Sequence, residues 1–232
     1  ARGGTGQAGV TAAPFEAWID EWYMRGDTVD TLQLRAAGTQ FSYDVTLEAQ
    51  GPLILHGQDG YSVKSQQGQA SYYYSQPSYA LSGTLTLPQG EVAVTGSAWL
   101  DREWSSQPLA SDQTGWDWFS ISFEGGEKLM GFRLRQADDS YYTSGTWITA
   151  EGYTTALPDG SFDATVLEIS DVGGRDVPTR WQVRVPDYDV DITVEALNPQ
   201  AWMDMSIPYW EGPVQISGNR TGVGYLEMTG YD

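Results

Sequence analysis

The sequence of 232 residues contains no cysteine and only one histidine. The absence of cysteine excludes disulfide bonds, thiolate metal sites and cysteine nucleophiles. Because His56 is the only imidazole, zinc or iron sites that need several histidines are excluded as well. Any metal would need oxygen ligands. We expect neither a metal nor another cofactor.

Basic residues are also scarce. Only 12 Lys and Arg stand against 31 Asp and Glu, which gives a formal net charge of −19 at pH 7. This charge argues against a nucleic-acid partner and against strong binding to anionic membranes, and its simplest role is solubility. No run approaches the roughly 18 apolar residues of a membrane-spanning helix.

Aromatic and apolar residues are abundant. They make up 13% and 40% of the chain, which is enough to pack a core. Alternation with a period of two residues recurs, while no stretch sustains the helical repeat, so the pattern predicts an all-β protein. The predicted strands are Phe15–Met24, Thr31–Arg35, Gln40–Ala49, Tyr72–Gln76, Tyr79–Leu87, Val92–Glu103, Trp116–Phe123, Glu127–Arg135, Ser140–Ile148, Phe162–Ile169, Arg180–Val185, Asp189–Ala196, Tyr209–Ser217 and Thr221–Thr229.

Turn residues from Trp116 onward predict consecutive antiparallel hairpins, which close most simply as an up-and-down barrel or a strongly bent sandwich. We place a domain boundary at residues 90 and 91. Residues 91–232 are then a second barrel, and residues 1–90 are the later part of a first one. The opening strands of that first barrel are expected in an N-terminal segment missing from the chain, and residues 1–90 would pack with them. Residues 57–69 show no strand pattern and predict a long loop.

The densest mixture of indoles and charges lies around residues 99–104. Trp99, Asp101 and Glu103 share one parity, so their side chains project from the same side of a strand. Paired carboxylates beside indoles could supply a general acid with a raised pKa. The alternative is a structural ion pair in which Arg102 or Arg133 neutralises a carboxylate.

Trp116-Asp117-Trp118 repeats this mixture on the next predicted strand. The two indoles face one way and the carboxylate faces the other way. Our interpretation is that one indole belongs to the core and the other to the wall of a binding pocket. The alternative is that both belong to the core.

His56 ends an apolar strand just before the predicted loop. It is a candidate acid–base group because imidazole titrates near neutral pH, although a structural role is the alternative. Tyr61 and the run Tyr72–Tyr74 place phenols on or near the same loop. At least one phenol of the run must point into any cavity there, where it could orient water. The alternative is a ladder of aromatic rings across strands.

These candidates lie in six ordered blocks, at residues 56–64, 70–77, 96–106, 115–119, 128–135, and 209–213 with 222–231. The third block contains Trp99-Leu-Asp-Arg-Glu-Trp104. Together the blocks resemble the lipocalin-like family of carotenoid 1,2-hydratases (hydroxyneurosporene synthases) and predicted secreted hydrolases. The resemblance extends from Pro14 to Tyr231.

The resemblance implies two consecutive lipocalin-like antiparallel β-barrels with a ligand cavity at or between them. It also implies a reaction in which a carboxylic acid protonates a carbon–carbon double bond, an aromatic pocket shelters the cation and a polar side chain delivers water. Asp101 would be the acid, and His56 or Tyr73 would hold the water. The ligand-binding side chains would be Trp99, Trp104, Trp116, Trp118, Tyr61, Tyr72, Glu103 and Trp210.

The sequence thus predicts an exported protein, periplasmic or secreted, that encloses a hydrophobic isoprenoid or lipid-like molecule. Its missing N-terminus could also carry a membrane anchor. Whether it is an enzyme stays open at this point; as an enzyme it would be a hydro-lyase, or an isomerase or cyclase. The alternatives are a non-catalytic carrier of the same ligand and, less favoured, a carbohydrate-binding β module.

Overall fold

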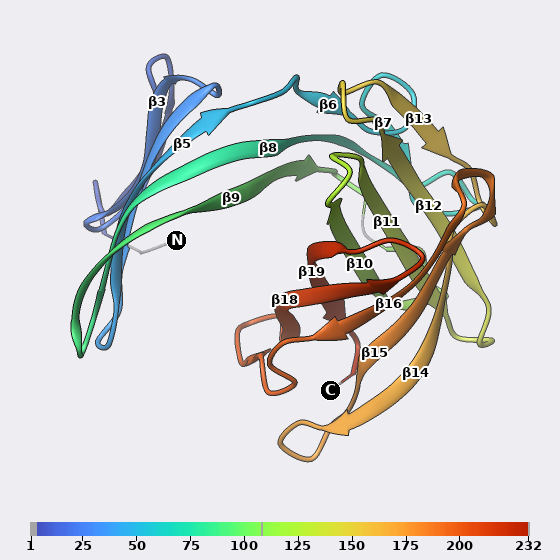
Figure 1. Ribbon diagram of the computed structural model, residues 1–232. Coiled ribbons are helices and arrows are strands. Elements are labelled where there is room, and N and C mark those ends of the chain that lie inside the picture. The colour runs from blue at the N-terminus through green and yellow to red at the C-terminus, as the bar shows by residue number, and fades with distance from the viewer. Residues whose placement is uncertain (1–3, 108, 232) are drawn as a thin grey trace. The chain divides into compact units, whose positions relative to one another are not determined.

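The computed structural model describes residues 4–107 and 109–231 and consists almost entirely of β-strands, which confirms the predicted all-β class (Figure 1). The chain forms two compact units. Unit 1 comprises Ala1–Leu53 and Ser75–Asp101, and unit 2 comprises Ile54–Tyr74 and Arg102–Asp232. The predicted boundary at residues 90 and 91 falls inside unit 1, so the predicted domains and the compact units divide the chain at different places.

Two long strands, β8 (Ala70–Leu87) and β9 (Gly90–Trp104), contribute residues to both units. In unit 1, the first five strands pair antiparallel in chain order, and β8 then pairs with the fifth. The core of this unit includes Leu32, Leu47 and Tyr79. The remaining strands of unit 1 are β1 (Ala8–Ala12), β2 (Phe15–Ile19), β3 (Trp22–Thr28), β4 (Thr31–Ala37) and β5 (Ser42–Ala49).

Unit 2 contains a sheet in which the last strand of the chain returns to pair with β10, in the order β13-β12-β11-β10-β19-β18-β16-β15-β14. The sheet curls into a half-barrel, as in a lipocalin-like fold. Its strands are β10 (Gln113–Phe123), β11 (Lys128–Gln136), β12 (Tyr141–Ile148), β13 (Thr154–Leu157), β14 (Asp163–Asp171), β15 (Asp176–Val185), β16 (Val190–Ala196), β17 (Trp202–Met203), β18 (Tyr209–Gly218) and β19 (Gly222–Thr229). Unit 2 also holds β6 (Ile54–Leu55), β7 (Tyr61–Val63) and the short 3₁₀ turn Pro186–Tyr188.

The concave interior of unit 2 is packed with aromatic rings. Phe119 lies 5.7 Å from Phe162 and 5.6 Å from Trp181, measured between ring centroids. Gly131 makes this packing possible, because a Cβ there would lie 2.6 Å from the Phe162 ring. Large buried rings of this kind supply much of the apolar area that stabilises a domain.

A buried ion network shares this interior. The Asp117 carboxylate accepts hydrogen bonds from Arg133 Nε at 2.9 Å, from Arg135 and from the Tyr231 hydroxyl at 2.8 Å. Arg133 also stacks on Trp181, with its guanidinium carbon 4.6 Å from the ring centroid. Burial and the neighbouring Asp117 charge raise the pKa of Tyr231, so its hydroxyl keeps its proton and donates.

The local structure departs from the sequence expectations in several places. The predicted strand Phe15–Met24 is a hairpin, because Asp20 adopts a left-handed conformation (φ 53°) and reverses the chain. The predicted loop at residues 57–69 contains the strand β7. The strand β8 runs through Pro77 without a break, and β1, β13 and β17 were not predicted.

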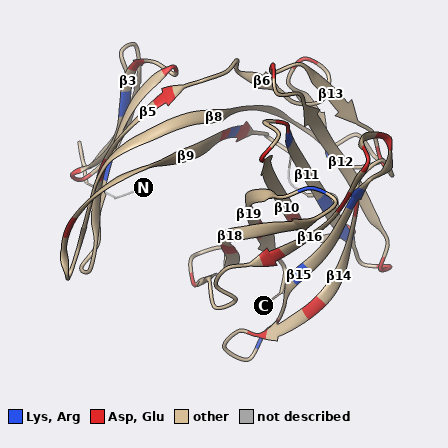
Figure 2. Ribbon diagram, viewed as in Figure 1, with Lys and Arg blue, Asp and Glu red and all other residues tan. Residues whose placement is uncertain are grey.

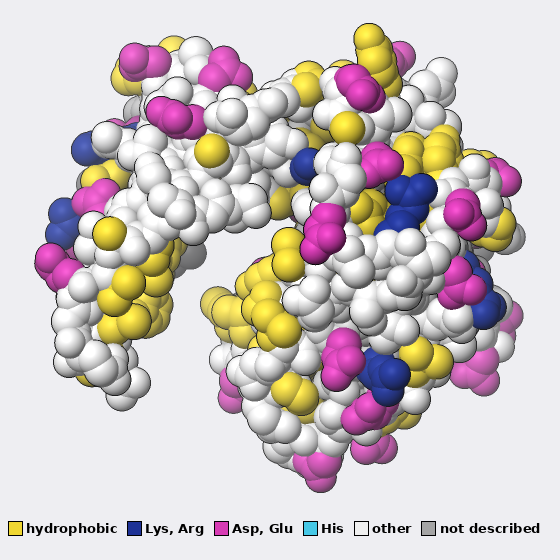
Figure 3. All heavy atoms as spheres, viewed as in Figure 1, with side chains coloured by type: hydrophobic (Ala, Val, Ile, Leu, Met, Phe, Trp, Pro, Cys, Tyr) yellow, Lys and Arg dark blue, Asp and Glu magenta, His cyan; other side chains and the backbone are white. Residues whose placement is uncertain are grey.

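Acidic side chains are distributed over the strands and turns of each unit, whereas Lys and Arg occupy few positions (Figure 2). Hydrophobic side chains also reach the surface (Figure 3). Among the exposed ones are Leu197, Met203, Met205 and Ile207, which are close to β17 in the sequence. Within the described ranges, no helix has the length and apolar character needed to cross a membrane.

We expect Asp117→Asn to lower the free energy of unfolding by about 3–5 kcal/mol, because it leaves two arginines without their buried carboxylate. Chemical denaturation monitored by circular dichroism measures this loss. The matched control is Glu195→Gln, which removes only a 3.9 Å contact between exposed side chains. Equal stabilities of the two variants would show that the Asp117 network does not stabilise unit 2.

Candidate functional site

The candidate site lies on the convex side of the unit 2 sheet. Directly paired residues of antiparallel strands project from the same face. Trp118 of β10 pairs with Phe132 of β11 on one side and with Glu227 of β19 on the other, and Glu227 pairs with Glu211 of β18. We call the side that bears these four residues and Thr146 the outer face. Asp117 and Phe119 alternate with Trp118 and therefore point to the interior.

The segment from His56 to Tyr73 covers part of the outer face. Tyr73 is only 2% exposed, and its phenol oxygen accepts a hydrogen bond from Trp118 Nε1 at 2.9 Å. The imidazole of His56 lies against the Tyr73 ring, with the ring centroids 4.2 Å apart. The His56 backbone N–H donates to the Tyr73 carbonyl at 3.1 Å. Two predicted catalytic side chains, His56 and Tyr73, are thus in contact with each other, and Tyr73 is also bound to the indole of Trp118.

His56 is a neutral imidazole at neutral pH. Its side chain is 1% exposed, and its Nδ1 lies 2.8 Å from the Thr146 hydroxyl. Burial lowers the pKa of His56 from 6.5 to about 3, and the nearby Lys64 charge adds to this shift. A neutral imidazole can accept or position a proton, but it cannot serve as the acid that protonates a substrate at pH 7.

Lys64 and Glu103 form an ion pair at the edge of this cluster. The Lys64 ammonium lies 2.8 Å from Glu103 Oε1, which also accepts a hydrogen bond from the Ser71 hydroxyl at 2.5 Å. The same ammonium lies 3.9 Å from the centroid of the Phe132 ring. Glu103 is therefore paired with Lys64, a partner that the sequence analysis did not suggest. Arg133, one of the two arginines suggested as a partner, is bound to Asp117 in the interior.

Asp101 belongs to unit 1. It accepts hydrogen bonds from Trp99 Nε1 at 3.0 Å and from the Ser75 hydroxyl. Trp99 and Asp101 therefore share one side of β9, as their parity predicts. The predicted catalytic acid has an indole and a hydroxyl as hydrogen-bond donors.

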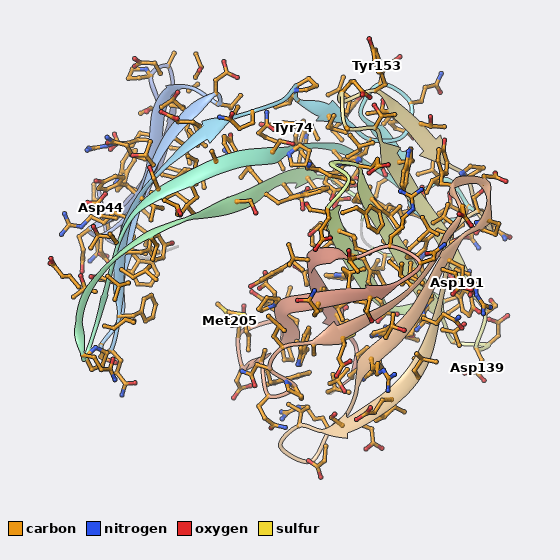
Figure 4. All side chains as sticks on the ribbon, in the orientation of Figure 1. Asp44, Tyr74, Asp139, Tyr153, Asp191 and Met205 are labelled. Carbon is orange, nitrogen blue, oxygen red and sulfur yellow. The ribbon has the colours of Figure 1, made fainter. Side chains whose placement is uncertain are left out.

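Several residues predicted to bind the ligand form an exposed aromatic ladder on the other side of β8. The rings of Tyr72 and Trp104 stack with their centroids 5.8 Å apart, and Tyr61 and Tyr74 contact them edge to face. Tyr72 is 57% exposed and Trp104 54%. Tyr74 is labelled on β8 in Figure 4. Because neighbouring residues of a strand face opposite sides, this ladder and Tyr73 cannot line the same surface.

Two interpretations of tryptophans need correction. Trp210, predicted to bind the ligand, is fully buried in the core of unit 2, where its Nε1 donates to the Pro199 carbonyl at 2.7 Å. Trp116 and Trp118 both lie on the outer face, so neither is the core residue that we expected of one of them. The volume of the core comes from Phe119, Trp181 and their neighbours instead.

Sequence reasoning missed two carboxyl groups of the outer face, Glu211 and Glu227. Trp116 Nε1 donates to Glu227 Oε1 at 2.7 Å. Burial raises the pKa of Glu227, and the Glu103 charge raises it further. Burial also raises the pKa of Glu211, with a further contribution from Glu227. Glu211 follows Trp210 and Glu227 follows Leu226, and both of these preceding residues are in the core. Because neighbouring residues of a strand face opposite sides, this alternation could have predicted that both glutamates face away from the core.

Within residues 4–107 and 109–231, no three His, Asp or Glu side chains are grouped so that they could hold a metal ion. The chemistry that the outer face offers is that of a neutral imidazole, a phenol, indoles and carboxyl groups of raised pKa. Such groups can bind an apolar molecule and move protons.

A family model described as AttH-like matches residues 1–231 of the sequence. The chain belongs to the AttH-like family. No curated protein matches the sequence of this AttH-like chain.

Nine chains of solved structures are similar to the AttH-like chain, and two of them are informative here. The first is a crystal structure of a protein from Nitrosomonas europaea assigned to AttH, with a TM-score of 0.91 and 29% sequence identity over 100% of this chain and 74% of that one. The second is kievitone hydratase from Nectria haematococca, with a TM-score of 0.76 and 17% identity over 92% of this chain and 69% of that one. The likeness to kievitone hydratase shows the fold. The predicted relationship to the lipocalin-like hydratase group is confirmed.

The low pKa of His56 predicts how stability depends on pH. The unfolded chain takes up a proton at His56 below pH 6.5, whereas the folded chain does so only near pH 3. The folded state therefore loses stability as the pH falls through this window, by up to about 1.4 kcal/mol per pH unit from this group. We expect His56→Gln to lack this contribution, so that the stability difference between wild type and variant shrinks as the pH is lowered.

Denaturant unfolding of both proteins at a series of pH values between the two pKa values measures this difference. Tyr73→Phe is the control, because it alters the same cluster and leaves the imidazole in place. Curves for wild type and His56→Gln that stay parallel across the window would contradict a neutral buried His56.

Proposed function

We propose that this AttH-like protein binds an apolar, isoprenoid or lipid-like molecule on the outer face of unit 2 and adds water to one of its carbon–carbon double bonds. The observation that carries this proposal is the contact of Tyr73 with both His56 and Trp118, which brings two groups able to hold water next to an indole. A structural neighbour of the same fold is a hydratase, which supports the reaction class. We further propose that the protein is exported.

An apolar ligand fits the side chains along this face. Trp118 and Trp116 are partly exposed; Trp118 pairs with the buried Phe132 and Trp116 with the buried Leu134. Toward β17, the Tyr209 hydroxyl contacts Met205 Sδ at 4.0 Å, and Met205 is 56% exposed. Figure 4 labels Met205. Methionine and aromatic side chains adapt to irregular apolar ligands, so this row of residues can hold a long hydrocarbon chain.

The same residues suit the cation that forms when a double bond is protonated. The face of an indole attracts a cation, and Trp118 has its Nε1 bound to Tyr73, which holds the ring in place. The Lys64 ammonium would oppose a second positive charge, but Glu103 balances it at 2.8 Å. His56 and Tyr73 would position the water that attacks the cation, because a neutral imidazole and a phenol both accept hydrogen bonds from water.

The reaction also requires a carboxylic acid that delivers a proton. The sequence predicts Asp101, which accepts hydrogen bonds from Trp99 and Ser75 in unit 1. Unit 2 adds Glu227, which lies beside Trp118 on the outer face. The outer face could bind and hydrate an alkene whichever of these two carboxyl groups delivers the proton.

Native mass spectrometry of gently purified protein should detect a bound apolar molecule. We expect Trp118→Leu to lose most of this ligand, because the variant lacks the indole at the centre of the outer face. The matched control is Trp104→Leu, since Trp104 lies in the exposed ladder and should not affect occupancy. Loss of the ligand from Trp104→Leu alone would place the binding surface on the ladder and contradict the proposal.

With an acyclic terpenoid alkene in isotopically labelled water, the wild-type protein should form an alcohol that carries the label. We expect Tyr73→Phe to lower kcat on the order of 100-fold, because it lacks the hydroxyl that positions water. Gas chromatography with mass spectrometry measures the product. A wild-type protein that binds such alkenes and forms no labelled alcohol is a carrier, and the hydratase part of the proposal is then wrong.

A further inference from the structure

Two carboxyl groups face each other on neighbouring strands of the outer face. Glu227 of β19 lies directly opposite Glu211 of β18 in the strand register, and Trp118 lies opposite Glu227 on the other side. Directly opposed residues have Cβ atoms about 4.5–5.5 Å apart. The two carboxyl groups are therefore close neighbours, and one of them adjoins the indole at the centre of the site.

Such a pair is costly when both groups are ionised. Like charges directly opposed across strands are destabilising, and partial burial strengthens their repulsion. Within the described part of the chain, neither Glu211 nor Glu227 forms an ion pair with Lys or Arg. The Lys64 cation beside Phe132 on this side of the sheet is paired with Glu103. A single proton held between the two carboxyl groups removes most of the repulsion.

The surroundings decide which group holds the proton. Glu227 lies opposite Glu211 in the strand register, and the Trp116 indole donates a hydrogen bond to it. The Glu103 charge raises the pKa of Glu227, and the Glu227 charge in turn raises the pKa of Tyr209 and Tyr225. Trp116 donates to Oε1, which leaves the proton to Oε2 of the same carboxyl. Burial is the largest cause of the raised pKa of Glu227. The Tyr209 hydroxyl hydrogen-bonds to Glu211 and partly offsets the rise in its pKa.

We propose that Glu227 is the proton-donating residue of the outer face and that it shares one proton with Glu211. This inference rests on the proposed hydration. The Glu227 O–H bond breaks as a C–H bond forms at one alkene carbon, which leaves the cation beside the Trp118 ring. A water oxygen then bonds to the other carbon. The proton that this water loses returns to the carboxylate pair, so the net change is the addition of one water molecule.

A pair with one proton can serve both halves of this reaction. The protonated member is an acid, and the ionised member is a base, as in other carboxyl pairs that share a proton. The outer face would then need no further acid in unit 2. Neutral His56 and Tyr73 keep the task of positioning the water.

Difference infrared spectroscopy tests the protonation directly. At pH 7 we expect wild type minus Glu227→Gln to show the carbonyl-stretch band of a protonated carboxylic acid. In Glu211→Gln, the same band should vanish at a lower pH than in wild type, because the opposing charge is absent. The matched control is Glu168→Gln, an exposed glutamate of β14, which should show no such band at pH 7. Absence of the band from the Glu227 difference spectrum overturns the inference, whether or not the protein has activity.

Turnover of the acyclic terpenoid alkene tests the catalytic role. Glu227→Gln should lose at least about 100-fold in kcat while binding the alkene as wild type does, and Glu168→Gln should match wild type. Full activity of Glu227→Gln overturns the inference, and so does loss of activity in Asp101→Asn alone, which would make Asp101 the donor. If the band is present but wild type converts no alkene, the proposed hydration fails and the proton on Glu227 stands.

Discussion

The ion network around Asp117 sets the orientation of β10, and the candidate site depends on that orientation. In the interior of unit 2, the Asp117 carboxylate forms ion pairs with two arginines and accepts a hydrogen bond from a tyrosine hydroxyl. Breaking such a buried network would leave charges without partners, so the strand cannot rotate or slip by one residue without a large loss of stability. Because side chains alternate along a strand, this constraint turns Trp116 and Trp118 to the outer face.

The neighbouring strands inherit this arrangement. Pairing of β19 with β10 carries Leu226 and Met228 into the core and places Glu227 between them on the outer side. Pairing of β18 with β19 does the same for Glu211, next to the buried Trp210. A single interior carboxylate thus determines where two exterior carboxyl groups lie. The acids and the indoles of the outer face follow from one register.

Alternation explains what the sequence could predict. It gave the all-β class, the opposed directions of Asp117 and its two tryptophans, and the shared side of Trp99 and Asp101 on β9. It also required one of three successive tyrosines to face differently from the other two. It could not say which side of each strand is the interior. A strand such as β10 carries large aromatic residues on both faces, so hydrophobicity does not distinguish them.

Long-range pairing explains what the sequence could not predict. His56 and Thr146 are 90 residues apart in the chain, and their contact depends on the short strand β6 lying over β12. The strand β7 pairs with β8, although its residues show no alternating pattern. A strand of three residues is too short to show such a pattern. Assignment of Trp210 to a binding surface failed for a similar reason: the register that buries it was visible only once β18 was paired.

The filled interior changes where a ligand of this lipocalin-like fold can bind. Aromatic rings and an ion network occupy the concave side of unit 2. The side chains that could take part in a reaction lie on the convex side instead. On that side, His56 and Tyr73 are buried because the segment that leads into β8 packs over the sheet. The covering segment brings Lys64, and its charge needs the Glu103 carboxylate. With that cation neutralised, the carboxyl groups of Glu211 and Glu227 are left to balance each other, and a shared proton is the simplest way in which they can do so.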